Sequence, residues 1–232
     1  MIENAGDYFS ISERIKRAYA KGGARALVVG VWRGLRERLF NYHTSYWYLR
    51  ELTKEFCSLT PQIKVDVDYD AIRKTLEWEE TLLHKGAFND EDYKEIGTAQ
   101  ANNHYIVNVS HQKRTIGFLK VGFGEVYFKE YADVVTIPQN MAFIYDTFVH
   151  SDYRGHGIAP YMINEVMKNL SQRGWVLVMC HIVPDNYASQ KVYEKIGFQR
   201  VSHVWNVRCC GLSLFGPHPR RLMHTVSESS AK

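Results

Sequence analysis

The fold is decided by residues 144–159, Ile-Tyr-Asp-Thr-Phe-Val-His-Ser-Asp-Tyr-Arg-Gly-His-Gly-Ile-Ala. An apolar, β-branched run ends at Val149, a polar turn follows, and a helical pattern begins after Gly157. A strand, a glycine-rich turn and a helix start together aim several backbone N–H groups at one point, which suits a phosphate. The run Arg154-Gly-His-Gly-Ile-Ala159 lacks the Gly-Lys-Ser/Thr ending of a Walker loop and the first glycine of a dinucleotide fingerprint. The stretch therefore predicts a phosphate site of another kind.

Composition indicates an ordinary globular chain. Its 232 residues are 45% hydrophobic and 23% charged, which fits one large domain or one domain with an extension. A net charge of +4 and a pI near 8.8 fall short of a dedicated nucleic-acid binder, so no nucleic-acid partner is expected. The four cysteines form no C-x-x-C pair, which argues against a metal site and favours a reducing, cytoplasmic setting. The first residues lack the pattern of a signal peptide, and no apolar run approaches the ~20 residues of a membrane span.

Residues 1–60 are expected to form a basic, amphipathic, α-helical extension. Helices are predicted at about 11–20, where Ser10 and Glu13 fit a capping box, and at about 24–40. Residues 11–40 contain eight basic and two acidic residues and so carry +6, which leaves −2 for the rest of the chain. Three interpretations stay open: a helical hairpin packed on the main domain with a solvated basic face, a peripheral contact with an anionic membrane surface, or a docking face for an anionic partner. The aromatic residues of 41–60 are expected to pack this extension against the domain that follows.

Residues 61–222 are predicted to form an α/β domain with a mixed sheet. Helices are expected from about 68–70 to 86, and at 90–102, 157–172 and 185–196, whereas residues 122–140 read as loop. Strands are expected at 63–67, 105–109, 115–121, 144–149, 175–180, 198–207 and 212–224. The crossover helix at 157–172 makes the strands on either side of it a parallel pair. Residues 223–232 are expected to be a disordered tail.

A second motif follows about thirty residues after the first. It reads Asn186-Tyr-Ala-Ser-Gln-Lys-Val-Tyr193-Glu-Lys-Ile-Gly197-Phe198. This motif resembles Asn-x-x-Ala/Ser-x-x-Leu/Val-Tyr-x-Lys-x-Gly-Phe, the second cofactor motif of the GNAT N-acetyltransferase family. The run beginning at Arg154 is similar to that family's first motif, Gln/Arg-x-x-Gly-x-Gly/Ala. The resemblance covers about residues 61–222 and implies the acyl-CoA N-acyltransferase fold.

The resemblance implies a GNAT-type N-acyltransferase that moves an acetyl group from acetyl-CoA, or from another acyl-CoA, to a primary amine. Direct attack in a ternary complex is expected, since no cysteine lies in a motif for a covalent acyl-enzyme. Tyr193 corresponds to the family tyrosine beside the CoA sulfur, where a phenol can return a proton to the thiolate. The resemblance assigns cofactor binding to Phe148, Val149, His150, Arg154, Gly155, His156, Gly157, Ile158, Ala159, Asn186 and Ser189.

The general base is left open by the sequence. Asp146 is the first candidate, because a carboxylate on the strand can take the ammonium proton directly or through water. Regular alternation places Asp146, Phe148 and His150 on one face and Tyr145, Thr147 and Val149 on the other, unless a bulge intervenes. His181 and His150 are further candidates, and a water chain is another alternative.

Two alternatives to a cytoplasmic enzyme with a small-molecule amine acceptor remain. One is an acyl-CoA-binding regulatory module without turnover. The other is a membrane-surface N-acyltransferase that acts on an envelope amino sugar or a lipid-linked amine, with residues 11–40 as its anchor. A homodimer is open among the partners, and the sequence carries no motif that names the amine.

Overall fold

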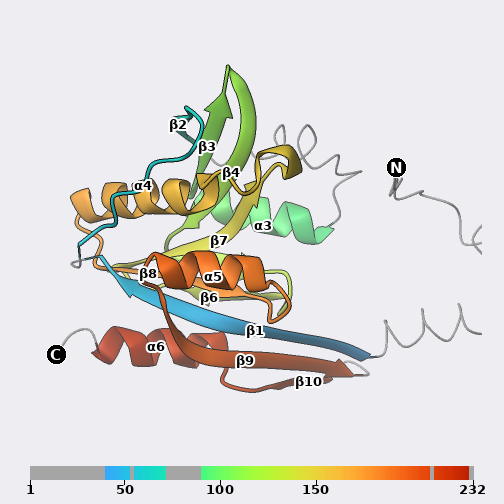
Figure 1. Cartoon of the computed structure of the whole chain (residues 1–232). Helices are drawn as coiled ribbons and strands as arrows, with labels where there is room; N and C mark the ends of the chain where they lie inside the picture. The colour runs from blue at the N-terminus through green and yellow to red at the C-terminus, as the bar shows by residue number, and fades with distance from the viewer. Residues whose placement is uncertain (1–39, 53–54, 72–89, 210–211, 230–232) are drawn as a thin grey trace, which may run out of the picture. The chain divides into compact units, whose positions relative to one another are not determined.

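A computed structural model describes residues 40–52, 55–71, 90–209 and 212–229 (Figure 1). By their internal contacts the described residues divide into two compact units, one that contains 40–43, 206–209 and 212–215 and one that contains the described residues of 44–205 and 216–229. The described part of the smaller unit contains the antiparallel pairing of the end of β9 (Gln199–Cys209) with β10 (Leu212–Phe215), in which Leu214 pairs with Val207. The two motifs of the sequence lie in the larger unit.

The larger unit is built on a mixed β-sheet. Its neighbouring strands follow the order β9-β1-β8-β7-β4-β3-β2, and β5 and β6 form a separate two-stranded sheet. The strands are β1 (Phe40–Glu51), β2 (Asp66–Ala71), β3 (Tyr105–His111), β4 (Arg114–Gly122), β5 (Glu125–Phe128), β6 (Asp133–Thr136), β7 (Met141–Val149), β8 (Leu177–Ile182), β9 (Gln199–Cys209) and β10 (Leu212–Phe215). The helices are α3 (Asp90–Ala101), the 3-10 turn η2 (Ser151–Tyr153), α4 (Ile158–Gln172), α5 (Tyr187–Lys195) and α6 (Pro219–Ser229).

The parallel pair β7 and β8 is short and then opens. Residues 141–144 of β7 pair with residues 177–180 of β8, and α4 is the crossover between the two strands. Beyond Ile144 and Cys180 no pairing continues, although β7 runs on to Val149 and β8 to Ile182. This divergence leaves a gap in the sheet at the carboxyl ends of both strands, where open α/β sheets bind their ligands.

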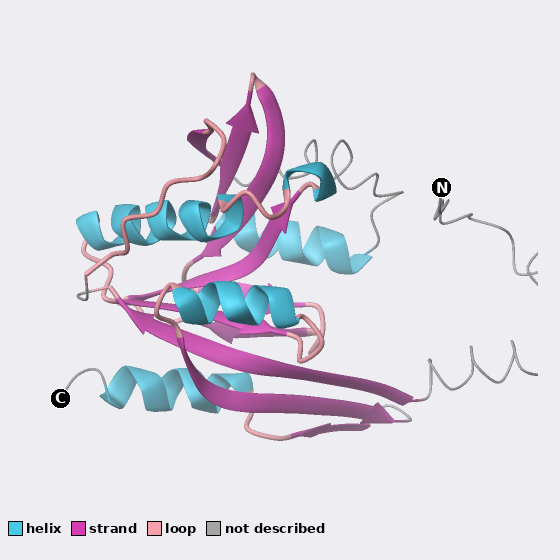
Figure 2. Cartoon of the chain, viewed as in Figure 1, coloured by secondary structure: helices cyan, strands magenta, loops and turns pink. Residues whose placement is uncertain are grey.

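The bulk of the core lies between the sheet and the helices α4 and α5. Fully buried side chains of α4, among them Ile163 and Val166, pack against Leu119 of β4 and Val178 of β8. Figure 2 shows α4 and α5 as neighbouring cyan helices alongside the magenta strands. On the opposite face of the sheet, Ala99 of α3 packs with residues of β3 and β4. Burial of this much apolar surface, at about 25 cal/mol per Å², is the main stabilising contribution to such a fold.

The mixed α/β architecture predicted from the sequence is confirmed, with several corrections. Residues 40–51, expected in a helical extension, form strand β1, which pairs antiparallel with β8. The first predicted strand lies three residues later than expected, at 66–71, and the predicted loop of 122–140 contains the β5–β6 hairpin. Residues 219–229 form α6, so the strand expected over 212–224 ends at Phe215 and the tail is helical to Ser229. The helices expected at 11–20 and 24–40, and nearly all of the one expected at 68–86, lie outside the described residues.

A β-bulge at Tyr145 corrects the expected alternation along β7. Lys120 pairs with Asp146 but its neighbour Val121 pairs with Ile144, so Tyr145 is the extra residue. The Tyr145 ring lies 5.9 Å from Nζ of Lys120, on the same side as Asp146. Regular alternation would place Tyr145 on the opposite face, and the bulge is the exception to it that the sequence left open. Among the helices within the described ranges, none is both long and apolar enough to cross a membrane.

Candidate active site

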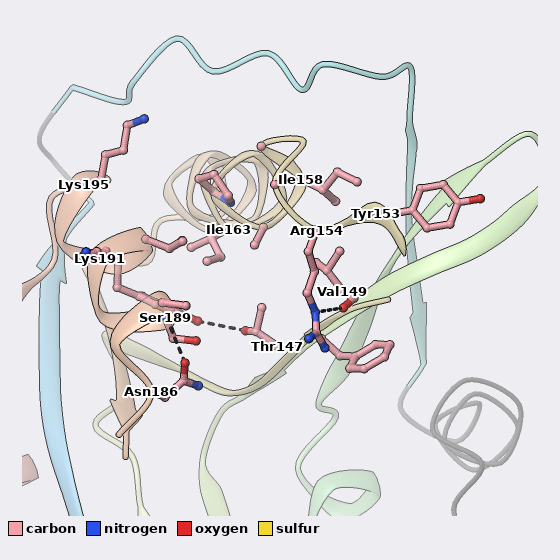
Figure 3. Close-up of a pocket in the computed structure, with 18 residues that line it drawn as sticks. Thr147, Val149, Tyr153, Arg154, Ile158, Ile163, Asn186, Ser189, Lys191 and Lys195 are labelled. Carbon is pink, nitrogen blue, oxygen red and sulfur yellow. Dashed lines mark hydrogen bonds between the residues drawn. The ribbon is translucent and has the colours of Figure 1, made fainter. Parts of the chain in front are cut away.

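A cavity of about 570 Å³ opens where β7 ends and α4 and α5 begin (Figure 3). Nine of the eleven residues predicted for cofactor binding line it, and so does Tyr193. His150 and His156 are the two that do not. The remaining lining residues are Thr147, Tyr153, Pro160, Ile163, Ala188, Lys191, Val192 and Lys195.

The turn before α4 forms one end of this cavity. Gly155 and Gly157 have φ angles of +83° and +77°, in the left-handed region that favours glycine. Gly157 is the N-cap of α4, so the free N–H groups of the first helical turn and the positive end of the helix dipole lie at the cavity. A phosphate can be bound by such a helix start without any further device.

The two histidines of the loop stabilise the turn. The ring of His150 lies 3.6 Å from the carboxylate of Asp152, and its Nδ1 accepts a hydrogen bond from the Asp152 backbone N–H. His156 places its Nδ1 within 3.2 Å of the carbonyl oxygens of Tyr153 and Arg154. Both side chains are therefore engaged with the loop itself, and their assignment to cofactor binding stays a prediction that rests on their backbone.

Three cations border the cavity. Arg154 donates from Nε to the carbonyl oxygen of Val149 at 3.0 Å, which fixes the side chain along the end of β7 (Figure 3). Lys191 and Lys195 of α5 also line the cavity. Sequence reasoning missed both lysines as site residues, although Lys195 stands at a fixed position of the second motif. Their spacing of four places them on one helix face, and that was the available signal.

The end of β7 offers backbone groups to the gap in the sheet. The N–H of His150 donates to the carbonyl of Ile116 at 2.8 Å. Hydrogen-bonded and non-hydrogen-bonded pairs alternate in an antiparallel ladder, so Phe148 exchanges bonds with Phe118, whereas Thr147 and Val149 point their N–H groups away from β4. Those two N–H groups face the side on which β8 has diverged.

The other wall of the cavity is α5. Asn186 caps this helix by accepting a hydrogen bond from the N–H of Ser189 at 3.1 Å. Tyr193 is 5% exposed, and its hydroxyl lies 3.0 Å from Oγ1 of Thr147, so this pair bridges α5 and β7. Burial raises the pKa of Tyr193 well above its ordinary value, and the Thr147 hydrogen bond offsets only part of that rise. The phenol therefore stays protonated at neutral pH.

A second, smaller cavity of about 180 Å³ adjoins the first. The two share Thr147, Asn186, Ser189 and Tyr193 as lining residues. The smaller cavity adds Asp146 and His181, which stand at the carboxyl ends of β7 and β8. The structure thus brings together both predicted catalytic residues, Asp146 and Tyr193, and the alternative base His181, around the gap between the strands.

Asp146 belongs to a ladder of alternating charges. The Nζ of Lys120 lies 3.3 Å from Oδ2 of Asp146 and 3.2 Å from Oε1 of Glu95. Glu95 also pairs with Lys129, whose Nζ lies 2.8 Å from Oδ1 of Asp92. Lys120 is 1% exposed, so its ammonium depends on these carboxylates for its stability.

His181 lies in an aromatic enclosure next to this ladder. Its ring centroid is 5.6 Å from that of Trp47, 5.5 Å from that of Phe128 and 5.8 Å from that of Phe143. Burial lowers the pKa of His181, although the charges of Glu130 and Asp146 act in the opposite direction. Its Nε2 lies 4.0 Å from Oε1 of Glu130, whereas Nδ1 is shut off from solvent and has no hydrogen-bond partner.

The arrangement suits group transfer from a long phosphorylated carrier. One end of the larger cavity has cations and the free N–H groups of the α4 start, and its other end has the buried phenol of Tyr193. The carboxylate of Asp146 and the imidazole of His181 lie in the adjoining smaller cavity. Within the described part of the chain, no group of three or more His, Cys, Asp or Glu side chains could hold a metal ion.

Comparisons with known proteins agree with this geometry. The model of the acetyltransferase (GNAT) family matches residues 69–198, which include both motifs and the two cavities. An uncharacterized N-acetyltransferase, YycN from Bacillus subtilis (strain 168), is 33% identical over 67 residues, which are 29% of this chain and 43% of that relative. The chain thus matches less than half the length of this curated relative.

Among solved structures, similar chains share the fold at low identity. A GCN5-related N-acetyltransferase from Sphaerobacter thermophilus superimposes with a TM-score of 0.53 at 12% identity, covering 83% of this chain and 59% of that one. A tandem GNAT protein from the clavulanic acid biosynthesis pathway has a TM-score of 0.51 at 13% identity, covering 74% and 55% respectively.

Proposed function

Because the chain belongs to the acetyltransferase (GNAT) family, we propose that it is an N-acyltransferase that transfers the acetyl group of acetyl-CoA to a primary amine. The observation that carries this proposal is the junction of two cavities at Tyr193. A helix start and three cations border the larger cavity, which supports a cofactor that ends in phosphates, and polar side chains line the smaller one, which supports an acceptor there. An amine and a thioester carbonyl would meet where the two cavities share Thr147 and Tyr193.

The larger cavity would hold CoA in an extended form. The pyrophosphate would lie on the backbone of Gly155 to Ala159 at the start of α4, with Arg154, Lys191 and Lys195 supplying positive charge. The pantetheine arm would run along β7, where the N–H groups of Thr147 and Val149 face the gap. Val149 N–H is our candidate for the donor that polarises the thioester carbonyl, because such a donor stabilises the oxyanion of the tetrahedral intermediate. Asn186 and Ser189 would contact the arm from α5.

The chemistry then needs two proton transfers, because the attacking amine must lose a proton and the leaving sulfur must gain one. The amine nitrogen attacks the thioester carbon, a C–N bond forms, and the C–S bond breaks with release of the thiolate. The Tyr193 phenol would give its proton to the sulfur. Such a transfer is reasonable in this dry site because burial raises the proton affinity of a thiolate as well as that of the phenol. Asp146 would engage the amine from the other side.

The experiment that tests this function is a thiol-release assay with acetyl-CoA and a panel of acceptors: a diamine, an amino sugar, an aminoglycoside and a short peptide. Release of CoA that depends on the amine, with the acetylated amine found by mass spectrometry, is the expected result. Calorimetric titration with CoA runs in parallel. Binding of CoA without turnover on any of the four amines would instead favour a regulatory acyl-CoA-binding module.

A further inference from the structure

We propose that His181 is the group that removes the proton from the attacking amine and that Glu130 stabilises the imidazolium so formed. This inference rests on the proposed transferase function and assigns one residue of the same site. It replaces Asp146, the first candidate from the sequence, in the role of proton acceptor.

The two ring nitrogens of His181 have different surroundings. Nδ1 is closed off from solvent without a hydrogen-bond partner, so an incoming proton cannot reach it from the cavity. Nε2 faces Oε1 of Glu130 at 4.0 Å, and His181 lines the smaller cavity. For Nε2 to act as the base, the neutral ring must carry its hydrogen on Nδ1, which leaves a lone pair at Nε2.

The enclosure of His181 keeps the ring neutral before the reaction. Trp47, Phe128 and Phe143 surround it with uncharged rings, and its side chain is only 10% exposed. A positive charge inside this ring of apolar side chains would lose most of its hydration, which disfavours the imidazolium. Burial accordingly lowers the pKa of His181, which leaves it unprotonated and available at neutral pH.

Asp146 is less suited to accept the proton. Its Oδ2 lies 3.3 Å from the buried ammonium of Lys120. A proton on Asp146 would discharge one partner of that ammonium, and a buried cation that loses a partner is strongly destabilised. A proton on His181 has the opposite effect, since it places a positive charge near Glu130 and Asp146. Asp146 is therefore better placed to attract the amine than to deprotonate it.

The proton balance is simple in this scheme. As the C–N bond forms, the nitrogen becomes positively charged and more acidic, and its proton passes to Nε2 of His181. The sulfur takes the Tyr193 proton when the C–S bond breaks. Afterwards the His181 imidazolium gives its proton, directly or through water, to the Tyr193 phenolate, so that both side chains regain their starting forms. No net proton is stored on the enzyme.

The first test compares wild type with His181→Asn, using the acceptor of the panel that reacts fastest. A general base contributes about 10²- to 10⁴-fold, so kcat/KM should fall by that factor while the Kd for acetyl-CoA stays the same. The charged and titratable groups described around His181 are Glu130 from the β5–β6 turn, Asp146 of β7 and Tyr193 of α5. The pH dependence of kcat/KM is measured for both enzymes. Protonation of the amine itself lowers the rate at acidic pH in both, so a further acidic limb that only wild type shows belongs to His181.

Glu130→Gln tests the partner. Loss of the nearby negative charge removes an influence that raises the pKa of His181, so the acidic limb should move to lower pH, with a smaller loss of rate than in His181→Asn. His224→Asn, on the exposed side of α6, is the control and should leave both rate and limb unchanged. If Glu130→Gln acted only by loosening the packing around His181, the rate would fall but the acidic limb of the pH–rate profile would not move.

A measurement on wild type does not depend on how the variants fold. Histidine ring NMR at pH 7.5 should show His181 neutral, with its hydrogen on Nδ1. A hydrogen on Nε2, or an imidazolium, would overturn the assignment, as would a His181→Asn enzyme within threefold of the wild-type rate with its acidic limb intact. Absence of turnover by wild type on the whole panel would instead sink the transferase function itself, and the role of His181 with it.

Discussion

Replacement of Lys120 by Met should destabilise the protein by about 3 kcal/mol, because removal of one partner of a buried ion pair leaves the others uncompensated. The cost for such pairs is about 3–5 kcal/mol, and the surroundings of Lys120 place it at the lower end. Asp146 is 40% exposed and can be hydrated after the loss, whereas Glu95 is 13% exposed but keeps Lys129 as a partner. With a urea dependence of about 1–3 kcal/mol per M, the unfolding midpoint should fall by about 1–3 M.

The matched control is Lys168→Met. Lys168 lies 2.7 Å from Glu165, a shorter distance than either pair of Lys120, but the two side chains are 38% and 29% exposed. Surface pairs three residues apart on a helix contribute about 0.2–0.5 kcal/mol, so its midpoint should hardly change. Equal midpoints for the two variants, or a loss below about 1 kcal/mol in Lys120→Met, would refute the claim that burial decides the strength of this ladder.

Three further predictions concern residues of the site and two residues outside it, Gly174 and His104. Tyr193→Phe should lower kcat by about 10²- to 10⁴-fold with the Kd for acetyl-CoA unchanged, and a rate near wild type would remove the phenol from the mechanism. Gly157→Ala and Gly174→Ala should each lose about 1–2 kcal/mol in urea unfolding, because both glycines have positive φ; calorimetry should show weaker acetyl-CoA binding only for Gly157→Ala, which lines the cavity. Burial lowers the pKa of His104 and of His181. Their contribution to stability is therefore complete above the unfolded pKa near 6.5 and is lost as the pH falls below it, by up to about 1.4 kcal/mol per pH unit for each. Equal urea-unfolding midpoints at pH 7.5 and 5.5 would contradict this.

The larger cavity was predictable because its signals are local. Gly157 and Asn186 sit at helix starts, and each motif spans a single turn or helix, so chain order alone places them. The two motifs meet because α4 connects the parallel strands β7 and β8, and such a crossover connection is nearly always right-handed. Tyr193 and Thr147 approach each other for that reason, although the motif names only the tyrosine.

The charge ladder and the enclosure of His181 could not be predicted in the same way. Lys120 stands in an apolar strand, and its carboxylate partners come from α3 and β7, which the sequence separates by about fifty residues. A pattern of residue types carries no information on such distances. The position of Glu130 could not be predicted either, because it lies in the turn of the β5–β6 hairpin. The strands of that hairpin are only four residues long and no glycine lies between them, so the sequence gives little signal for it.

Strand β1 has a consequence for how the chain folds. Tyr46 pairs with Ile182, so 136 positions separate the two partners, and β1 lies in the interior of the sheet between β8 and β9. During synthesis at about 5–20 residues per second, β1 would wait on the order of ten seconds for β8 to follow it. Throughout that interval its aromatic side chains and its unpaired edges would be open to other chains, and closure of so long a loop makes folding slow. The strands that follow β8 can assemble only on a segment made well before them, so the newly made protein should depend on protection from aggregation until β8 has been synthesised.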